Sequence, residues 1–418
     1  AIANVLVRIA RELAASGIEP PLRVVKLASR GTEADQELEG AGVELVKDER
    51  LESLLAEADE TGLPVVVGST VWSLWKQMRD INRAETEKES GPEIPIRSLF
   101  DVIVIDEASQ MKVPDALIAL SSIRRGGRVV LCGDDRQLAP ILHGSYPREE
   151  TLFGSAFTHF AGHFGRMALR ESRRMNRALV RWPRRLFYQG FVSMDPDRRL
   201  SLSSEATPTD PLDALLWDVF LRPEDAVVFC SYEGFRATVR NPFEAGLVAR
   251  IARLARGGMM DPQTGDAYTP ERFRSHALAV IAPHRAQNSA ILGELIAGGW
   301  PRDELPVVDT VERMQGNERE LIIVSYAVAD REYAEREAEF LLNPNRFNVS
   351  ITRPRSKLIV FMSDEILRTV PGDEQVMTDS MAIKGYPAHF RSVRQLEMAA
   401  PDGTPVRMTV RTRSLAGP

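Results

Sequence analysis

Residues 101–140 constrain the fold more than any other stretch, because two short apolar runs there each end in acidic and polar residues. The first run, 102–105, shows no alternation of apolar and polar side chains, which is typical of a parallel strand covered on both faces. It leads directly into Asp106 and Glu107. The second run, 129–132, leads into a Gly-Asp-Asp-Arg-Gln segment. Ligands of open α/β sheets bind at the carboxyl ends of strands, so this arrangement predicts a site for a metal-bound phosphate.

Composition places few further limits on the chain. Its 418 residues are enough for two or three domains, and its net charge of −6 argues against a uniformly basic nucleic-acid binder but not against a locally basic channel. Cys132 and Cys230 each end an apolar run, so we expect both in the core and the protein in a reducing, cytoplasmic compartment. The excess of arginine over lysine suggests a GC-rich, bacterial genome. We find no apolar run of membrane-spanning length and expect no membrane partner.

Strand and helix patterns alternate along the chain, which predicts an α/β fold with two parallel sheets. Helical spacing of apolar residues is expected over 1–16, 243–256 and 285–297. The expected strands of the first sheet are 22–27, 43–46, 64–67, 102–105 and 129–132, and those of the second are 226–230, 278–282, 306–309, 321–325 and 357–362. We therefore divide the chain into a first lobe at 1–200, a linker rich in Ser, Thr, Pro and Asp at 201–224, a second lobe at 225–366, and a C-terminal extension of unknown role at 367–418, which is a candidate surface for protein partners.

Two segments of the opening stretch resemble motifs II and III of the superfamily-1 helicases. The closest branch contains the nonsense-mediated-decay RNA helicase and related DNA helicases. The segments are Asp106-Glu107-Ala108-Ser109 and Gly133-Asp134-x-x-Gln137-Leu138-x-Pro140. An Asp-Glu pair alone is equally consistent with the end of any buried strand. The second segment, at this spacing, makes the resemblance specific.

The second half of the chain resembles motifs IV, V and VI of the same family at 281–287, 308–318 and 346–355. Four positions depart from the family pattern, of which Glu312 for Asp keeps the charge and Met314 for Phe keeps the bulk. His284 stands where the family has Tyr, although an imidazole can also stack on a base or bind a phosphate. Pro354 replaces Ala and removes a backbone donor beside Arg353. Each segment alone could be a strand and its turn, but their order along the chain is highly specific.

The most basic segment, 164–190, resembles the part of these helicases that places an arginine near the nucleotide phosphates. Arg174 matches that arginine, and Arg173 stands where the family has Tyr. A solvated helix face is the alternative interpretation of such a charge run. Upstream, Ser69 and Thr70 resemble motif Ib, which contacts the nucleic-acid backbone. A cap between a strand and a helix explains these two hydroxyls nearly as well.

The resemblance implies two RecA-like lobes of the P-loop NTPase type, with ATP hydrolysed between them and Mg²⁺ as the metal. It implies that Asp106 holds Mg²⁺ and that Glu107 deprotonates the attacking water. It also implies that Gln137 senses the γ-phosphate and that Arg174 and Arg353 reach it. Further nucleotide contacts are expected at Asp134, Arg173, Gln315, Gly316 and Glu318. Contacts to a single strand of DNA or RNA are expected at Ser69, Thr70, His284, Arg285, Thr310 and Val311.

One motif of the family is missing from the sequence. A P-loop needs Gly-Lys-Ser/Thr, and none of the seven lysines follows a glycine. Because the family places that loop upstream of motif Ia, we expect this chain to be truncated before it, with an incomplete first lobe, and to be inactive alone. The parent protein is then expected to be a helicase or translocase that moves 5′-to-3′. A nucleic-acid-stimulated ATPase that remodels complexes without unwinding, and a non-catalytic scaffold, are the alternatives.

Overall fold

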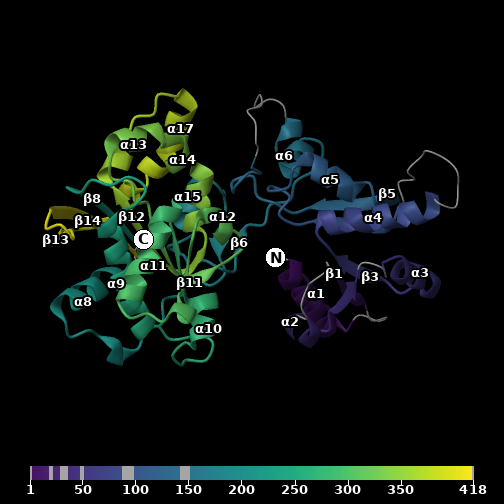
Figure 1. Ribbon diagram of the computed structural model, residues 1–418, viewed down its shortest axis with the longest axis horizontal. Helices are drawn as coiled ribbons and strands as arrows, with labels where there is room; N and C mark the ends of the chain where they lie inside the picture. The colour runs from purple at the N-terminus through teal and green to yellow at the C-terminus, as the bar shows by residue number, and fades with distance from the viewer. Residues whose placement is uncertain are drawn as a thin grey trace. The chain divides into compact units, whose positions relative to one another are not determined.

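The computed structural model describes residues 2–17, 22–28, 36–47, 51–86, 98–141 and 151–416, and it divides into two compact units. Unit 1 comprises residues up to 135 together with 139–166. Unit 2 comprises residues 136–138 and 167–418. Each unit combines helices with parallel strands, so the expected α/β class is confirmed (Figure 1). No helix in these described ranges has the length and apolar character needed to cross a membrane.

Unit 1 contains two small parallel sheets. Its elements are α1 (Ile2–Ser16), β1 (Arg23–Ala28), α2 (Gln36–Gly40), β2 (Glu44–Lys47), α3 (Leu51–Thr61), β3 (Val65–Gly68), α4 (Val71–Thr86), β4 (Phe100–Ile105), α5 (Val113–Leu120), β5 (Ile123–Leu131), η2 (Thr151–Phe153) and α6 (Ala156–Ala161). The strand orders are β2-β1-β3 and β4-β5. All five expected strands of this part are therefore present, but they form two sheets rather than the single first sheet that we expected.

The expectation that β4 and β5 are buried on both faces is wrong. Val102 and Val104, on one face of β4, are 54% and 61% exposed, and Val129 and Val130 of β5 are also exposed. Ile105 is buried on the opposite face of β4. The residues that the structure describes therefore do not cover both faces of these two strands. Cys132, at the end of β5, is likewise exposed rather than in the core, whereas Cys230 is buried as expected.

Unit 2 is built on a seven-stranded sheet. Its strands are β8 (Asp225–Glu233), β9 (Leu278–Ile281), β10 (Val307–Asp309), β11 (Arg319–Ser325), β12 (Pro354–Ser363), β13 (Ser392–Ala399) and β14 (Pro405–Ser414), in the order β10-β9-β11-β12-β8-β14-β13. The five expected strands of the second lobe form the parallel part. A separate short pair joins β6 (Glu171–Ser172) to β7 (Val192–Ser193).

Helices cover both faces of this sheet. One face packs against α8 (Pro211–Leu216), η4 (Trp217–Leu221), α9 (Pro242–Gly258) and α11 (Arg285–Ala297). The other packs against α7 (Arg181–Leu186), α12 (Val311–Met314), α13 (Arg331–Arg336), α14 (Ala338–Leu341), α15 (Pro344–Ile351), α16 (Asp364–Arg368) and α17 (Glu374–Lys384). In Figure 1, α13, α14 and α17 lie together on one side of unit 2, and α8, α9 and α10 (Pro270–Arg272) lie on the other. Strands β9 and β11 are buried on both faces, as their apolar sequences predict, whereas the edge strand β10 is half-buried.

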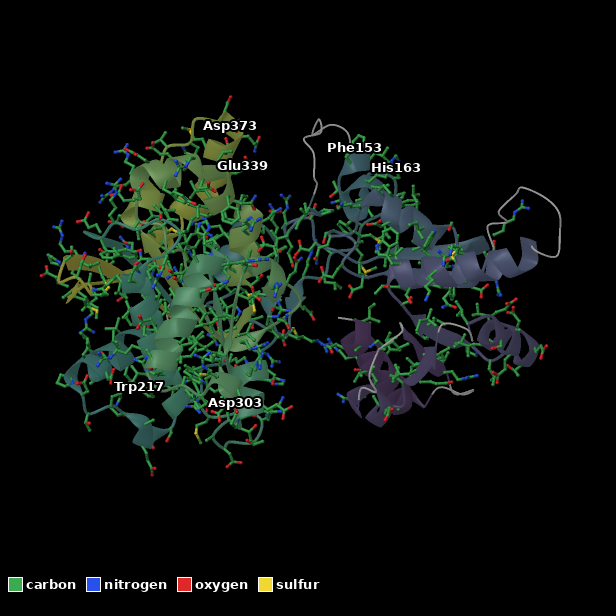
Figure 2. All side chains as sticks on the ribbon, viewed as in Figure 1. Phe153, His163, Trp217, Asp303, Glu339 and Asp373 are labelled. Atoms are coloured by element: carbon green, nitrogen blue, oxygen red, sulfur yellow. The ribbon has the colours of Figure 1, made fainter. Side chains whose placement is uncertain are left out.

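Three expected boundaries differ from the packing that the structure shows. Residues 167–200 belong to unit 2 rather than to the first lobe, because apolar side chains of α7 and its flanks enter the unit 2 core. The expected linker 201–224 is packed into unit 2, where Leu216, Phe220 and Leu221 are fully buried. The ring of Trp217 (Figure 2) lies so close to Gly258 that a Cβ added to this glycine would be 2.3 Å from the ring. The expected extension 367–418 supplies β13 and β14, which complete the sheet.

A carboxylate lies fully buried near the start of α9. Glu244 accepts hydrogen bonds from the hydroxyl of Tyr232 at 2.5 Å, from the hydroxyl of Ser325 at 2.5 Å, and from the N–H of Ala327 at 3.0 Å. Desolvation by burial raises the pKa of Glu244 to about 7, although these hydrogen bonds favour the ionised form. Folding therefore shifts the titration of this group into the neutral range.

Glu244→Gln is expected to remove a pH dependence of stability between about pH 4.5 and 7. The pKa of this carboxyl is raised from 4.5 to about 7 on folding, so increasing pH ionises the unfolded chain first. The free energy of unfolding then falls through this range, by about 3 kcal/mol. Urea unfolding at pH 5 and pH 8 measures the loss, with Glu339→Gln at an exposed position (Figure 2) as the matched control. An equal loss in the wild type and in Glu244→Gln would contradict the assignment.

Candidate functional site

The two acidic segments of unit 1 lie side by side. The parallel pairing of β4 with β5 places Ile105 opposite Leu131, so both strands end at the same edge. The N–H of Ala108 donates to the carbonyl of Cys132 at 2.8 Å, and the N–H of Asp134 donates to the hydroxyl of Ser109 at 3.3 Å. The expectation that two neighbouring strands deliver polar residues to one edge is therefore confirmed for Asp106, Glu107 and Asp134, whereas Gln137 of the second segment belongs to unit 2.

Glu107 adopts an uncommon backbone conformation at that edge. Its φ of +52° lies in the left-handed region, which usually costs a non-glycine residue about 1–3 kcal/mol. Its N–H donates to Asp106 Oδ1 at 2.9 Å, and its Oε2 accepts from Gln110 Nε2 at 2.8 Å. These two contacts fix the turn. The chain consequently leaves the strand sharply, and the two carboxylates follow the last strand residue directly.

The second segment approaches the first so closely that only glycine fits at its start. A Cβ on Gly133 would lie 2.9 Å from the ring of Phe157 and 2.9 Å from the backbone nitrogen of Ser109. Neither neighbour can retreat easily, because the N–H of Phe157 also donates to the carbonyl of Ala108 at 3.1 Å. Gly133 therefore sets the spacing between the two segments.

In unit 2, two predicted nucleotide contacts bind each other. Arg174 Nε lies 2.5 Å from Glu318 Oε2, and Arg174 Nη1 donates to the carbonyl of Thr352 at 2.9 Å. Arg355 Nε lies 3.4 Å from the other oxygen of Glu318. Burial of Glu318 opposes ionisation, but the charges of Arg174 and Arg355 outweigh it, so the pKa of this carboxyl lies below its usual value. Glu318 is thus an anion held by two arginines.

Three more predicted contacts meet beside this ion pair. Arg353 is only 2% exposed, donates from Nε to the carbonyl of Val349 at 3.1 Å, and donates from Nη2 to Gln137 Oε1 at 3.2 Å. Gln315 Nε2 lies 3.5 Å from the same oxygen of Gln137. Residues from motifs III, V and VI therefore converge within unit 2. Gly316 has a φ of +76°, so the turn that follows Gln315 requires glycine.

Three side chains that hold these residues together, Asn348, Tyr188 and Arg355, were not among the predicted site residues. Asn348 Nδ2 donates to the carbonyl of Arg136 at 2.8 Å and to Tyr188 Oη at 2.6 Å, which ties residues 136–138 to motif VI. Arg355 lies between Glu318 and Glu320, at 3.4 and 3.8 Å. The second arginine of the Thr-Arg-Pro-Arg sequence was the available signal for Arg355. Tyr188 is one of the positions at which 164–190 matches the family segment, which was the available signal for this side chain.

The predicted nucleic-acid contacts occupy varied environments. Thr70 Oγ1 accepts from the N–H of Ser73 at 3.1 Å, so this hydroxyl caps α4, and Ser69 Oγ donates to the carbonyl of Thr70 at 2.9 Å. Arg285 is exposed at the start of α11, and Thr310 is half-buried at the start of α12. The side chain of Val311 packs in the core, so only its backbone remains for a strand.

His284 and Arg173 complete the set. The imidazole of His284 stacks against Phe340, with ring centroids 5.5 Å apart, and approaches Tyr333 edge-on at 6.2 Å. Burial lowers the pKa of His284, so the ring is neutral at pH 7. One face of this ring is therefore taken by Phe340, from the charged segment 331–340, instead of standing open. Arg173 is exposed beside Arg174.

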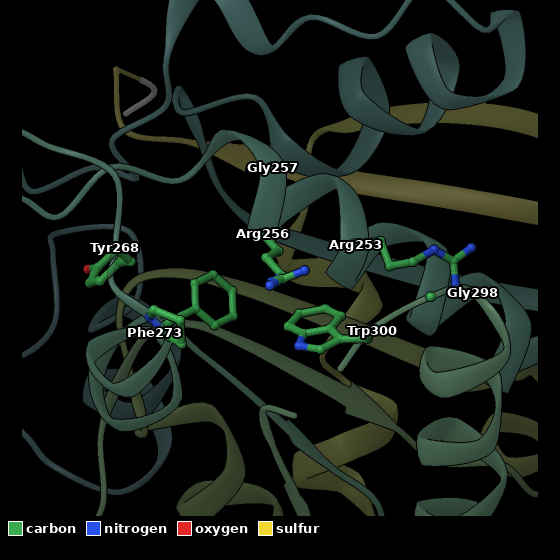
Figure 3. A pocket seen from close by; sticks show the side chains of 9 residues that line it. Arg253, Arg256, Gly257, Tyr268, Phe273, Gly298 and Trp300 are labelled. Carbon is green, nitrogen blue, oxygen red and sulfur yellow. The ribbon is translucent and has the colours of Figure 1, made fainter. Parts of the chain in front are cut away.

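A cavity of about 340 Å³ lies elsewhere in unit 2 (Figure 3). The end of α9, the start of α10 and the loop after α11 enclose it. The guanidinium of Arg256 lies over the ring of Trp300 at 5.0 Å and pairs with Glu304. This cavity is lined by none of the predicted site residues.

These folds and groupings define the class: an α/β P-loop NTPase core of the superfamily-1 helicase type, with RecA-like lobes. Two family models, each described as an AAA domain, match residues 149–365 and 86–145. The first spans 217 of the 418 residues, and the chain belongs to this AAA domain family. Its relatives are ATP-dependent helicases, so ATP use, typically with Mg²⁺, is the family property.

Three relatives show the extent of the similarity. The DNA replication ATP-dependent helicase/nuclease JHS1 of Arabidopsis thaliana is 25% identical over 349 residues, which are 80% of this chain and 24% of the relative. The DNA polymerase alpha-associated DNA helicase A of Saccharomyces cerevisiae is 28% identical, over 66% and 40%. The ATP-dependent helicase NAM7 of the same yeast is 27% identical, over 62% and 25%. The chain thus spans about a quarter to two-fifths of the length of these curated relatives.

One solved structure, an arterivirus nonstructural protein 10 helicase with DNA, overlaps 85% of this chain and 57% of its own, with 12% identity and a TM-score of 0.34. Relatives of this chain include proteins of a plant, a yeast, animals and an archaeon. They give the expected bacterial source no support.

Proposed function

We propose that this chain is the motor core of an ATP-dependent helicase or translocase that moves 5′-to-3′ along single-stranded DNA or RNA. The observation that carries the proposal is the convergence of Gln137, Arg174, Gln315, Glu318 and Arg353 in unit 2. These residues come from four separated motifs, and an α/β core needs no such group for its stability. Together they offer two guanidinium groups and two amides to an anionic ligand.

Unit 1 supplies the complementary chemistry in this proposal. Asp106 is exposed, and the only hydrogen bond that its carboxylate accepts within the described part of the chain comes from the N–H of Glu107, which leaves carboxylate oxygen for Mg²⁺. Mg²⁺ would neutralise charge on the β- and γ-phosphates there. Glu107 accepts the proton of the attacking water, while Arg174 and Arg353 stabilise the charge that develops on the γ-phosphoryl group. Arg174 has to exchange Glu318 for phosphate, and Glu318 then becomes available to the sugar of the nucleotide.

Phosphate release stimulated by a single strand tests this function. Because these 418 residues contain no Gly-Lys-Ser/Thr sequence, the assay uses a chain joined upstream to such a loop, with the 418-residue chain as the control. We expect turnover in the first protein, increased by poly-dT or poly-rU, and none in the second. Stimulated turnover by the 418-residue chain alone would contradict the assigned phosphate chemistry. Strand displacement then separates a helicase from a remodelling ATPase.

The 418-residue chain alone is expected to bind a single strand without sequence preference. Hydroxyls, backbone amides and a few arginines suit phosphate and sugar contacts, which fix position without reading bases. Anisotropy with poly-dT, poly-rU and a mixed 20-mer should give similar micromolar affinities and a modest salt slope of about −0.7 per phosphate contact. Arg285→Ala should reduce the magnitude of this slope by the amount that one phosphate contact contributes. Arg302→Ala, at an exposed position beyond the far end of α11, is the control and should leave the slope unchanged. Absence of binding at low salt would remove the translocase proposal from this chain.

A further inference from the structure

Helix α4 carries an exposed aromatic stripe that no motif explains. Trp72 and Trp75 are 60% and 40% exposed, and their ring centroids lie 6.3 Å apart with the planes at 75°. Leu74 and Met78, on the opposite stripe of the helix, are buried in the unit 1 core. The helix therefore packs through one face and presents both indoles on the other.

Exposure of two neighbouring indoles is unusual in this protein. Trp182 and Trp300 are almost fully buried by the same chain. Large apolar side chains that are exposed together mark interaction sites more often than chance. The α4 stripe is therefore a candidate contact surface, and its composition indicates the partner.

Two cations follow the two indoles on this helix. Lys76 follows Trp75 directly, and the guanidinium of Arg79 lies 5.1 Å from the centroid of the Trp75 ring. Aromatic rings interleaved with cations suit single-stranded nucleic acid, because bases stack on the rings and phosphates bind the cations. A purely apolar protein partner would gain nothing from Arg79 held over the ring.

We propose that α4 is a stacking platform for the bases of a single strand, an inference that rests on the proposed nucleic-acid function. The steep angle between the two rings prevents both from stacking on one base, so Trp72 and Trp75 each take a separate base. Lys76 and Arg79 contact the phosphates beside those bases. The helix begins directly after Ser69 and Thr70, so the platform continues the backbone contacts predicted there. A pair of Trp residues three positions apart, followed by Lys and Arg, was the sequence signal.

Strands with and without bases provide the decisive test. Anisotropy measures the affinity of the 418-residue chain for a dT 20-mer and for an abasic strand of equal length and charge. We expect the dT strand to bind about tenfold tighter or more. Trp72→Ala and Trp75→Ala should each weaken dT binding about fivefold or more and leave abasic binding unchanged. Leu117→Ala, at another exposed apolar position of unit 1, is the matched control and should change neither affinity.

Intrinsic fluorescence provides a readout that does not depend on truncation to alanine. Stacking of bases should quench tryptophan emission on addition of dT, and Trp72→Phe with Trp75→Phe should abolish most of that quenching while retaining binding. Circular dichroism confirms that each variant is folded. Equal affinity for dT and abasic strands, or equal losses on both, would overturn the platform and leave the proposed strand binding intact. Binding to neither strand by the wild type would instead overturn the proposed function itself.

Discussion

Replacement of Glu107 by Gln is expected to lower kcat by about 10² or more while ATP binding is retained. The change removes the group that accepts the proton of water but keeps its size, and Asp106 remains for the metal. The left-handed backbone at Glu107 should persist, because its N–H still donates to Asp106 Oδ1. The introduced amide would keep one oxygen able to accept from Gln110 Nε2.

The measurement is steady-state phosphate release by the protein joined to a Gly-Lys-Ser/Thr loop, together with equilibrium binding of a fluorescent ATP analogue. Asp115→Asn, in the first turn of α5, removes a carboxylate in the same unit and serves as the control. A kcat close to that of the wild type in Glu107→Gln would show that another residue activates water. Loss of nucleotide binding would instead assign Glu107 to the metal.

Arg353→Ala is expected to lower kcat by about 10³, with little change in strand affinity. A positive charge that acts on the transition state appears in kcat rather than in binding. The structure adds a complication, because Arg353 is buried and donates to Gln137 and to the carbonyl of Val349. Its removal leaves these acceptors with fewer donors, so some loss of stability should accompany the loss of turnover.

Arg353→Lys separates the two effects. Lysine retains the charge but cannot reproduce the planar fork that reaches two acceptors. We expect Arg353→Lys to lose less stability than Arg353→Ala, because one of the two acceptors can keep a donor, and still to lose most of its turnover. If strand binding collapsed while ATP hydrolysis survived in either variant, Arg353 would be a strand contact and the role given to motif VI would be wrong.

The sequence predicted local elements well because their signals are local. Short runs rich in apolar residues identified the ten expected strands, and Asp106 and Glu107 follow directly after the run that forms β4. The exposure of individual side chains could not be predicted in this way, because the apolar sequence around Val102 and Val104 is the same whether or not other elements pack on that face of the strand. Domain limits failed for a related reason, since the polar composition of 201–224 conceals Phe220 and its neighbours, which the core buries.

Contacts between residues far apart in the sequence could not be predicted either. Arg174 and Glu318 were each assigned to the nucleotide, but they are 144 positions apart and nothing in either motif shows that they bind one another. The motifs identified these residues, but only the fold shows that Arg174 and Glu318 form an ion pair when no ligand is bound. Asn348, which joins motif VI to residues 136–138, belongs to the same category.

The antiparallel addition of β14 to β8 affects how unit 2 can be produced by itself. A shortened version that ends at residue 366 would keep the pairing of β8 with β12 but would leave the backbone donors and acceptors on the β14 side of β8 without partners. It would also uncover the apolar surface that Val406, Met408 and Val410 occupy. Open strand edges of this kind pair with other molecules. Expression of such a version should yield aggregates or strand-exchanged dimers, whereas a version that continues through Ser414 should remain monodisperse in size-exclusion chromatography.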